Sequence, residues 1–235
     1  MSKDNKVLIS LLVFYLVLFL PFIGSVNLFD WDEVNFAEAA REMVVSGDWF
    51  NVTINFDPFW EKPPLFLWLQ ALSIKMFGVS SFSARLPNVI IGLITIIILF
   101  KSVFNRYDIK AATLSVLLYL GSFTPQLYFK TGIIDPLFNL LMFSSVIWLL
   151  KSIETKQTRM FFYAGLALGL AILTKGPVAI LLVGLTGLVY QIMHGTFYSV
   201  SSLLKLILGL LIFPAIYFGY GVYKQGWWHV QEFLA

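Results

Sequence analysis

Seven long apolar segments constrain the fold of this chain more than any other feature of its sequence. A helix needs about 20 mostly apolar residues to cross the hydrocarbon core of a bilayer, with a range of about 17–25. Because no water is available there to pair backbone groups, such segments cross as helices. We therefore expect an all-α fold, a polytopic transmembrane helix bundle with about seven spans. The segments are Val7–Ile23, Phe82–Phe104, Ala111–Tyr128, Ile133–Leu150, Met160–Leu173, Val178–Met193 and Leu203–Val222.

The composition agrees with a membrane protein and excludes several kinds of site. Hydrophobic residues make up 59% of the chain and charged residues 12%, against about 25% charged residues in soluble domains. The sequence has no cysteine and only two histidines, which excludes disulfides, thiolate metal sites and multi-histidine metal centres. It also has no run of basic residues, so nucleic acid is not expected as a partner.

Basic residues predict the orientation of the spans. They gather at the N-terminus and in two connectors, Lys101–Lys110 and Lys151–Arg159, and short basic loops stay in the cytoplasm. All three lie on that side only if the apolar segment Leu65–Phe77 does not cross, and its short length suits a helix lying in the interface. Residues 24–81 then form the first extracytoplasmic loop.

The same topology places ten of the 13 acidic residues outside the cytoplasm. Acidic residues contribute little to orientation, so their segregation is a separate indication of an acidic extracytoplasmic site. The ten are Asp30, Asp32, Glu33, Glu38, Glu42, Asp48, Asp57, Glu61, Asp135 and Glu232.

Asp32 stands at the start of the first helix expected in this loop. The residues after it place Val34, Ala37, Ala40 and Val44 on one helical stripe. Asp32 occupies the N-cap position of that helix, and its side chain can simply cap it. A carboxylate at a membrane-facing helix start can also bind a metal or accept a proton. The loop alone does not decide between these roles.

A second candidate pair, Glu61 and Lys62, precedes the double proline Pro63-Pro64. Two prolines stiffen the backbone and can open a helix at its first turn, so they set the direction of the pair. A lysine beside the membrane interface suits a phosphate. The same side chain can also snorkel to water without binding a ligand.

Three further charged residues lie near helix ends on the same predicted side. Asp135 lies at the mouth of a span, where a carboxylate is costly and is a functional candidate, or else caps the following helix. Lys175 precedes the helix break Gly176-Pro177, and Arg85 lies just before another proline. Each of these two cations can bind an anion or snorkel.

Collectively, the candidates predict one kind of ligand. Carboxylates and lysines from four segments share one side of the membrane and suit an anionic lipid headgroup, held directly or through a metal ion. A membrane transporter or lipid-binding module without catalysis is the alternative, as is a structural subunit. Transporters commonly carry inverted repeats and broken midplane helices. The sequence shows neither feature.

A series of short motifs follows along the chain, and their residues are Asp32-Glu33, Ala37-Glu38, Arg41-Glu42-Met43, Ser46-Gly47-Asp48-Trp49, Glu61-Lys62-Pro63-Pro64-Leu65, Phe77-Gly78, Ala84-Arg85-Leu86-Pro87, Ile134-Asp135-Pro136-Leu137 and Thr174-Lys175-Gly176-Pro177. In this order they resemble the GT-C glycosyltransferases of families 39 and 83, the protein O-mannosyltransferase-like and aminoarabinose-transferase-like enzymes. The resemblance spans nearly the whole chain and is specific to that superfamily.

The resemblance implies an inverting glycosyltransferase of a bacterial or archaeal plasma membrane. Such an enzyme moves a sugar from a polyprenyl-phosphate donor to a lipid, glycan or protein acceptor on the extracytoplasmic face, among membrane lipids. A divalent metal ion is the one cofactor implied. The site residues implied are Asp32 and Asp135 for catalysis, Lys62, Lys175 and Arg85 for the donor phosphate, and Glu61 for the metal.

The chain departs from the family in length. Family members continue with further spans and a soluble extracytoplasmic domain, so we expect residues 1–235 to be the N-terminal part of a GT-C transmembrane module. His229 does not match the histidine that the aminoarabinose branch carries just beyond this region. We therefore expect the chain to hold the front half of a site.

Overall fold

The computed structural model describes residues 3–29, 31–195, 198–228 and 230–231, and Asp30, His229 and Glu232 lie outside this part. The described chain is helical apart from one small two-stranded sheet, which confirms the all-α class. The elements are α1 (Lys3–Phe19), α2 (Asp32–Ser46), β1 (Thr53–Ile54), β2 (Asp57–Pro58), α3 (Leu65–Phe77), α4 (Ser81–Phe104), α5 (Ile109–Gly121), α6 (Phe123–Tyr128), α7 (Asp135–Thr155), α8 (Arg159–Lys175), α9 (Val178–His194) and α10 (Val200–Gln225).

The chain forms two compact units. Unit 1 comprises Met1–Trp49, Thr53–Phe56 and Leu67–Pro136, and unit 2 comprises Phe50–Val52, Asp57–Phe66 and Leu137–Ala235. Each unit therefore combines long helices with part of the predicted first extracytoplasmic loop. The last two residues of unit 1 are also the first two of α7.

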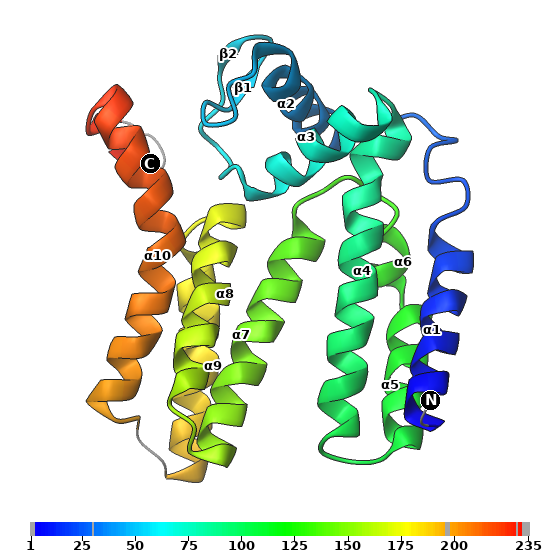
Figure 1. Ribbon diagram of the computed structural model, residues 1–235, viewed down its shortest axis with the longest axis vertical. Coiled ribbons are helices and arrows are strands. Elements are labelled where there is room, and N and C mark those ends of the chain that lie inside the picture. Colours follow the sequence, from blue (N-terminus) through cyan, green and yellow to red (C-terminus); the bar gives the residue numbers. More distant parts are fainter. Residues whose placement is uncertain (1–2, 30, 196–197, 229, 232–235) are drawn as a thin grey trace. The chain divides into compact units, whose positions relative to one another are not determined.

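In unit 1, helices α1, α4 and α5 pack against one another, as Figure 1 shows. The Tyr15 ring stacks on Phe19 at 4.5 Å between centroids, and its hydroxyl donates to the Val89 carbonyl at 3.0 Å. This hydroxyl lies against Gly92, where any side chain would overlap it. The close approach of α1 to α4 thus depends on a glycine facing a tyrosine.

The segment expected as one span, Ala111–Tyr128, is instead two helices, α5 and α6. Ser122 between them has an extended backbone, with φ −79° and ψ 156°. Pro125 follows within the next turn, and its ring cannot continue an unbroken helix from the residues before it. The expectation of one continuous helix was wrong for this reason.

In unit 2, helices α8 and α10 pack closely because glycines line their contact. Gly165 and Gly169 on α8 are spaced four residues apart, and a Cβ atom at either would overlap the carbonyl oxygen of Leu206 or Leu210. Gly209 on α10 meets the carbonyl of Phe162 in the same way. Small residues at this spacing let helix backbones approach in membranes, where lipid offers no hydrophobic drive for association.

Three helices, α4, α7 and α10, are long and apolar enough to cross a membrane, among the described residues. Helices α1, α8 and α9 have 17 residues each, or about 25 Å at 1.5 Å per residue. They stand at the lower limit for a span. Each of the seven expected segments contains helix, but length and hydropathy support fewer than seven spans among the described residues.

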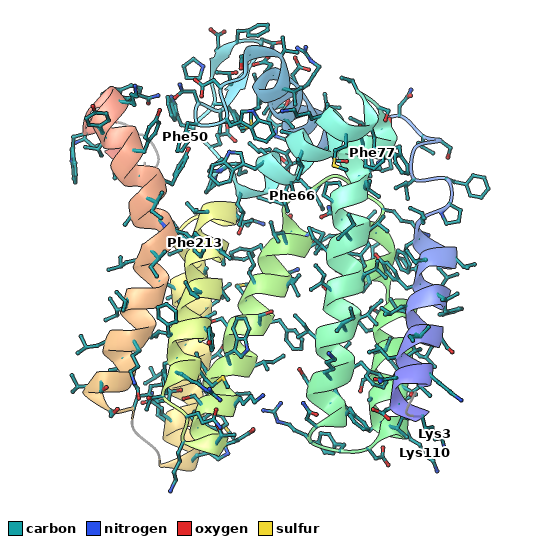
Figure 2. The ribbon with its side chains drawn as sticks, in the orientation of Figure 1. Lys3, Phe50, Phe66, Phe77, Lys110 and Phe213 are labelled. Carbon is teal, nitrogen blue, oxygen red and sulfur yellow. The ribbon has the colours of Figure 1, made fainter. Side chains whose placement is uncertain are left out.

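Two lysines mark one end of unit 1. Lys3 at the start of α1 and Lys110 in the first turn of α5 lie near one end, and Phe77 at the end of α3 lies near the other (Figure 2).

Helix α3 has the bounds that the sequence predicted and, with 13 residues, is about 20 Å long. That is too short to cross the roughly 30 Å hydrocarbon core.

Candidate active site

Helix α2 begins at Asp32, whose side chain is exposed. The cap position belongs to Trp31, with φ 69°, so the prediction that Asp32 is the N-cap was wrong. The predicted apolar stripe was wrong too, because Val34 is 40% exposed while Glu33 and Phe36 are buried. Compared with the predicted stripe, the helix is rotated about its axis. The first residue on its buried face is Glu33 and not the apolar residue Val34.

A buried ion pair causes this rotation. Glu33 is 1% exposed and Arg85, in the second turn of α4, is 2% exposed. The guanidinium donates two parallel bonds to the carboxylate, from Nε to Oε1 at 2.7 Å and from Nη2 to Oε2 at 2.8 Å. The same carboxylate accepts the backbone N–H of Phe29 at 2.7 Å and of Gly132 at 2.6 Å. Four donors thus satisfy one buried charge.

Arg85 has no donor left for a phosphate. Its remaining N–H groups bond three backbone carbonyls just before α2, and a guanidinium has five N–H donors in all. The prediction that Arg85 contacts the donor phosphate is therefore corrected, and its role is to hold Glu33 and the connection between α1 and α2. The three carbonyls are those of Ile23 at 2.7 Å, Val26 at 2.9 Å and Asn27 at 3.0 Å.

The environment of Glu33 lowers the pKa of its carboxyl below the ordinary 4.5. Burial alone would raise the pKa, but the bonds from Arg85, Phe29 and Gly132 favour the charged form and outweigh it. Because the folded-state pKa is lowered, ionised Glu33 stabilises the fold at neutral pH. This contribution is lost as the pH falls below about 4.5 through the folded-state value.

Glu33→Gln should therefore remove part of the acid sensitivity of the fold. We expect the melting temperature of the wild-type protein in detergent to fall more steeply than that of Glu33→Gln as the pH is lowered from about 6 to about 3, the range in which acidic side chains titrate. Circular dichroism at each pH measures both curves. Parallel curves for the two proteins would show that Glu33 does not titrate with folding.

Two other acidic residues of α2 also hold local structure. Glu42 is buried and accepts the Thr53 hydroxyl at 2.5 Å and the Phe56 N–H at 3.1 Å. It thereby holds the turn at Asn55 and Phe56, both of which have positive φ. Glu38 forms a half-exposed ion pair with Arg41 at 2.6 Å. Among Asp32, Glu33, Glu38 and Glu42, only Asp32 presents an exposed carboxylate.

Asp135, the second predicted catalytic acid, is the first residue of α7 and is half-buried. It lies in unit 1 with Asp32. The segment before it, Thr131–Ile134, is irregular and mostly buried. The two predicted catalytic carboxylates thus begin two helices and belong to one compact unit.

The predicted donor and metal residues Glu61, Lys62 and Lys175 all belong to unit 2. Glu61 is exposed and Lys62 half-buried. Just before them, the Trp60 ring meets the edge of Trp228 with centroids 5.3 Å apart. This contact ties the Glu61-Lys62 segment to the residues after α10.

Lys175 is the last residue of α8 and is exposed. Its Nζ lies 5.9 Å from the centre of the Phe138 ring on α7. Gly176 follows with φ 81°, a conformation that favours glycine. The predicted break at Gly176-Pro177 is confirmed, since α9 begins at Val178.

The part of the chain that the structure describes offers no group of three or more histidine, aspartate or glutamate side chains that could hold a metal ion. Glu61 alone does not make a site for a resident metal, which needs several ligands. The described residues therefore do not fit the metal that the resemblance implied.

A family model described as dolichyl-phosphate-mannose-protein mannosyltransferase matches residues 61–218. The chain belongs to this family. The match includes Glu61, Lys62, Asp135 and Lys175 and begins after Asp32. The chain is an integral membrane protein, because it belongs to this family and has helices long and apolar enough to cross a membrane.

Curated relatives of this family protein are aminoarabinose transferases. The undecaprenyl phosphate-alpha-4-amino-4-deoxy-L-arabinose arabinosyl transferase of Shewanella sediminis is 34% identical over 185 residues, which are 77% of this chain and 34% of the relative. The corresponding transferase 1 of Proteus mirabilis is 28% identical over 252 residues, which cover 100% of this chain and 45% of the relative. The chain thus spans less than half the length of these relatives.

Two solved structures share the fold. The crystal structure of ArnT from Cupriavidus metallidurans bound to undecaprenyl phosphate matches with a TM-score of 0.85 and 24% identity, over 95% of this chain and 42% of that one. Its apo structure matches with a TM-score of 0.84 over 99% of this chain and 44% of that one. These matches confirm the polytopic GT-C helical fold.

Sequence reasoning missed three site-supporting residues, Glu33, Gln70 and Asn88. Gln70 and Asn88 are fully buried and bond backbone groups around Gly132. A signal was present, because both are amides within apolar helices, where polar side chains are costly unless paired. Their partners lie far away in the sequence, and no local pattern identifies them.

Proposed function

We propose that this chain is the N-terminal part of a glycosyltransferase that moves a sugar from a polyprenyl-phosphate donor to an acceptor on the extracytoplasmic face of a bacterial plasma membrane. The observation that carries the proposal is the similarity over 100% of the chain to an undecaprenyl phosphate aminoarabinose transferase. The placement of the candidate acids and lysines at helix ends and in one loop supports it.

The reaction is a single displacement at the anomeric carbon of the sugar. An oxygen of the acceptor forms a bond to this carbon while the bond to the donor phosphate breaks, which inverts the configuration. The bonding electrons leave with the phosphate oxygen. No protein nucleophile is needed, because a phosphate is a good leaving group once its charge is offset.

Asp32 accepts the proton of an acceptor hydroxyl, or orients an acceptor phosphate that has no proton to give. Its exposed carboxylate suits this role, since a general base must reach a substrate atom. Asp135 is the second carboxylate of the site and orients the acceptor or the sugar. Both belong to the same compact unit of the chain.

Lys62 and Lys175 offset the charge that develops on the departing phosphate. An ammonium group acts on a phosphate as a point charge with three donors. The pair Pro63-Pro64 after Lys62 is buried and leads directly into α3, so the backbone at Lys62 is held in place. The stabilisation grows between the bound donor and the transition state, because the phosphate gains negative charge as its bond to the sugar breaks.

Lys62→Gln should weaken use of the donor. The loss of one charge-assisted hydrogen bond, about 1.5–3 kcal/mol, predicts a fall in kcat/KM for the lipid donor of roughly ten- to a hundredfold. The matched control is Lys75→Gln, which removes an exposed lysine of α3 and should leave kcat/KM unchanged. Equal values for Lys62→Gln and the wild type would remove Lys62 from the donor site.

Transfer of radiolabelled sugar tests the function itself. The full-length protein in liposomes is given labelled undecaprenyl phosphate-aminoarabinose as the first donor, because its relatives carry that donor in their names, together with a bacterial lipid extract. Label should move from the donor to a different molecule. A folded protein that moves no label from any polyprenyl-phosphate sugar would contradict the proposal.

A further inference from the structure

We propose that the buried Glu33–Arg85 pair positions Asp32 and Asp135 relative to each other, with Glu33 as the shared anchor of both. Glu33 is next to Asp32 in the chain, and its Oε1 accepts the N–H of Gly132, three residues before Asp135. Neither Glu33 nor Arg85 is exposed to a substrate. Both are therefore positioning residues, and the inference rests on the proposed function for its effect on catalysis.

The segment that leads into Asp135 is held by side chains from three helices. Asn88 on α4 donates from Nδ2 to the carbonyls of Thr131 at 2.6 Å and Ile133 at 2.8 Å. Gln70 on α3 donates from Nε2 to the carbonyl of Gly132 at 3.2 Å. Since Glu33 on α2 takes the Gly132 N–H, every polar backbone group of this glycine is bonded to a side chain.

Gly132 is suited to this close packing. A Cβ atom there would lie 3.0 Å from the Ala84 carbonyl oxygen, 3.0 Å from Gln70 Nε2 and 3.4 Å from Glu33 Cγ. The two distances of 3.0 Å are tighter than ordinary van der Waals contact. The glycine lets the three helices reach one backbone unit, which therefore cannot shift without moving Glu33 or Gln70.

Stability alone does not account for a charged anchor. Replacing a buried ion pair by apolar residues of similar size is often neutral or stabilising, because both charges must leave water. A paired guanidinium and carboxylate fix each other's orientation, because their two hydrogen bonds are parallel and lie in one plane. Here the fixed orientation of Glu33 constrains two chain segments, one that contains Asp32 and one that leads into Asp135.

The distances along the chain are short enough for this anchor to control both acids. Glu33 directly follows Asp32 in the chain. Gly132 lies three residues before Asp135, and three residues of extended chain span at most about 10 Å. A displacement of about 1 Å at a reacting group can cost about a hundredfold in rate. Loosening Glu33 should therefore reduce kcat, while donor binding through Lys62 and Lys175 is unaffected.

Glu33→Gln tests the anchor with two independent measurements on the full-length protein. In the transfer assay we expect kcat to fall about a hundredfold with the KM for donor within about threefold of the wild-type value. A loss of folded protein alone would lower the amount of monodisperse protein, not the kcat of the protein that remains. The matched control is Glu38→Gln, on the same helix in a half-exposed pair, which should change neither parameter.

The second measurement does not depend on activity. Spin labels at Val34→Cys on α2 and at Lys130→Cys report the distance between α2 and the segment that leads into Asp135. Both positions belong to unit 1, and Val34 is exposed while Lys130 is half-buried. The chain has no cysteine of its own, and any others in the full-length protein would be replaced by serine. Double electron–electron resonance should give a narrow distance distribution that broadens with Glu33→Gln and not with Glu38→Gln.

An unchanged distribution with Glu33→Gln would overturn the anchor even if sugar transfer is found. A broadened distribution in a protein that transfers no sugar would support the anchor and contradict the proposed function instead. If Glu33→Gln does not give folded protein, Asn88→Ala leaves the ion pair intact and removes the bonds to Thr131 and Ile133. It should broaden the distribution in the same way, and failure to do so would also overturn the anchor.

Discussion

Asp32→Asn in the full-length protein should lower kcat for transfer to a hydroxyl acceptor by roughly 10²–10⁴-fold, the usual contribution of a general base. The amide keeps the shape of the side chain and cannot accept the proton. Because Asp32 is exposed and is not the cap of α2, the substitution should leave stability almost unchanged. Initial rates with labelled donor, together with melting curves, measure the two effects separately.

Asp57→Asn provides the control for this experiment. Asp57 is an exposed carboxylate in the same predicted loop, at the start of β2, and it has no role in the proposed site. We expect wild-type rates for it. Full activity of Asp32→Asn with a hydroxyl acceptor would remove Asp32 from the chemical step, and equal losses in both variants would indicate a general effect of charge in the loop.

Gly165→Leu should have the largest effect on folding. Its side chain would overlap the Leu206 carbonyl oxygen and crowd the Leu210 N–H, and backbone atoms cannot turn away as a side chain can. Overpacking typically costs about 1–3 kcal/mol and occasionally more, and an overlap with backbone atoms should lie at the upper end of that range. We therefore expect a lower melting temperature in detergent and a smaller monodisperse fraction on size exclusion.

Gly184→Leu separates packing from the loss of a glycine. Gly184 lies within α9, and a Cβ atom there would meet nothing within 4 Å. Leucine also has the better helix propensity, by almost 1 kcal/mol, so this variant should be as stable as the wild type or more so. Equal destabilisation by the two substitutions would contradict the close contact of α8 with α10.

Local patterns predicted the elements that local chemistry determines. The bounds of Leu65–Phe77 and the break at Gly176-Pro177 agree with the structure, because apolar length and proline geometry act over a few residues. The break at Ser122 was missed because the segment was bounded by its overall apolar character, although Gly121, Ser122 and Pro125 mark the break locally. Hydropathy alone therefore gave Ala111–Tyr128 as one segment.

The candidate site shows a sharper limit. Glu33, Arg85 and Gly132 meet across sequence separations of 52 and 99 residues, and no pattern within a helix reveals such partners. Without them, Glu33 resembles one more acid of a solvated helix, and Arg85 resembles a free cation near the interface. Because of this long-range pair, α2 buries the face that carries Glu33 and not the predicted apolar stripe. The same pair occupies N–H donors of Arg85 that were predicted to bind the phosphate.

The fate of the lipid donor tests the central claim most directly. Purified full-length protein in liposomes is given a labelled polyprenyl-phosphate sugar, and mass spectrometry and NMR follow both halves of the donor. We expect release of one polyprenyl phosphate for each sugar transferred, with the anomeric configuration of the product inverted. Donor that crosses the bilayer with its sugar still attached, and no release of polyprenyl phosphate, would contradict it and indicate transport.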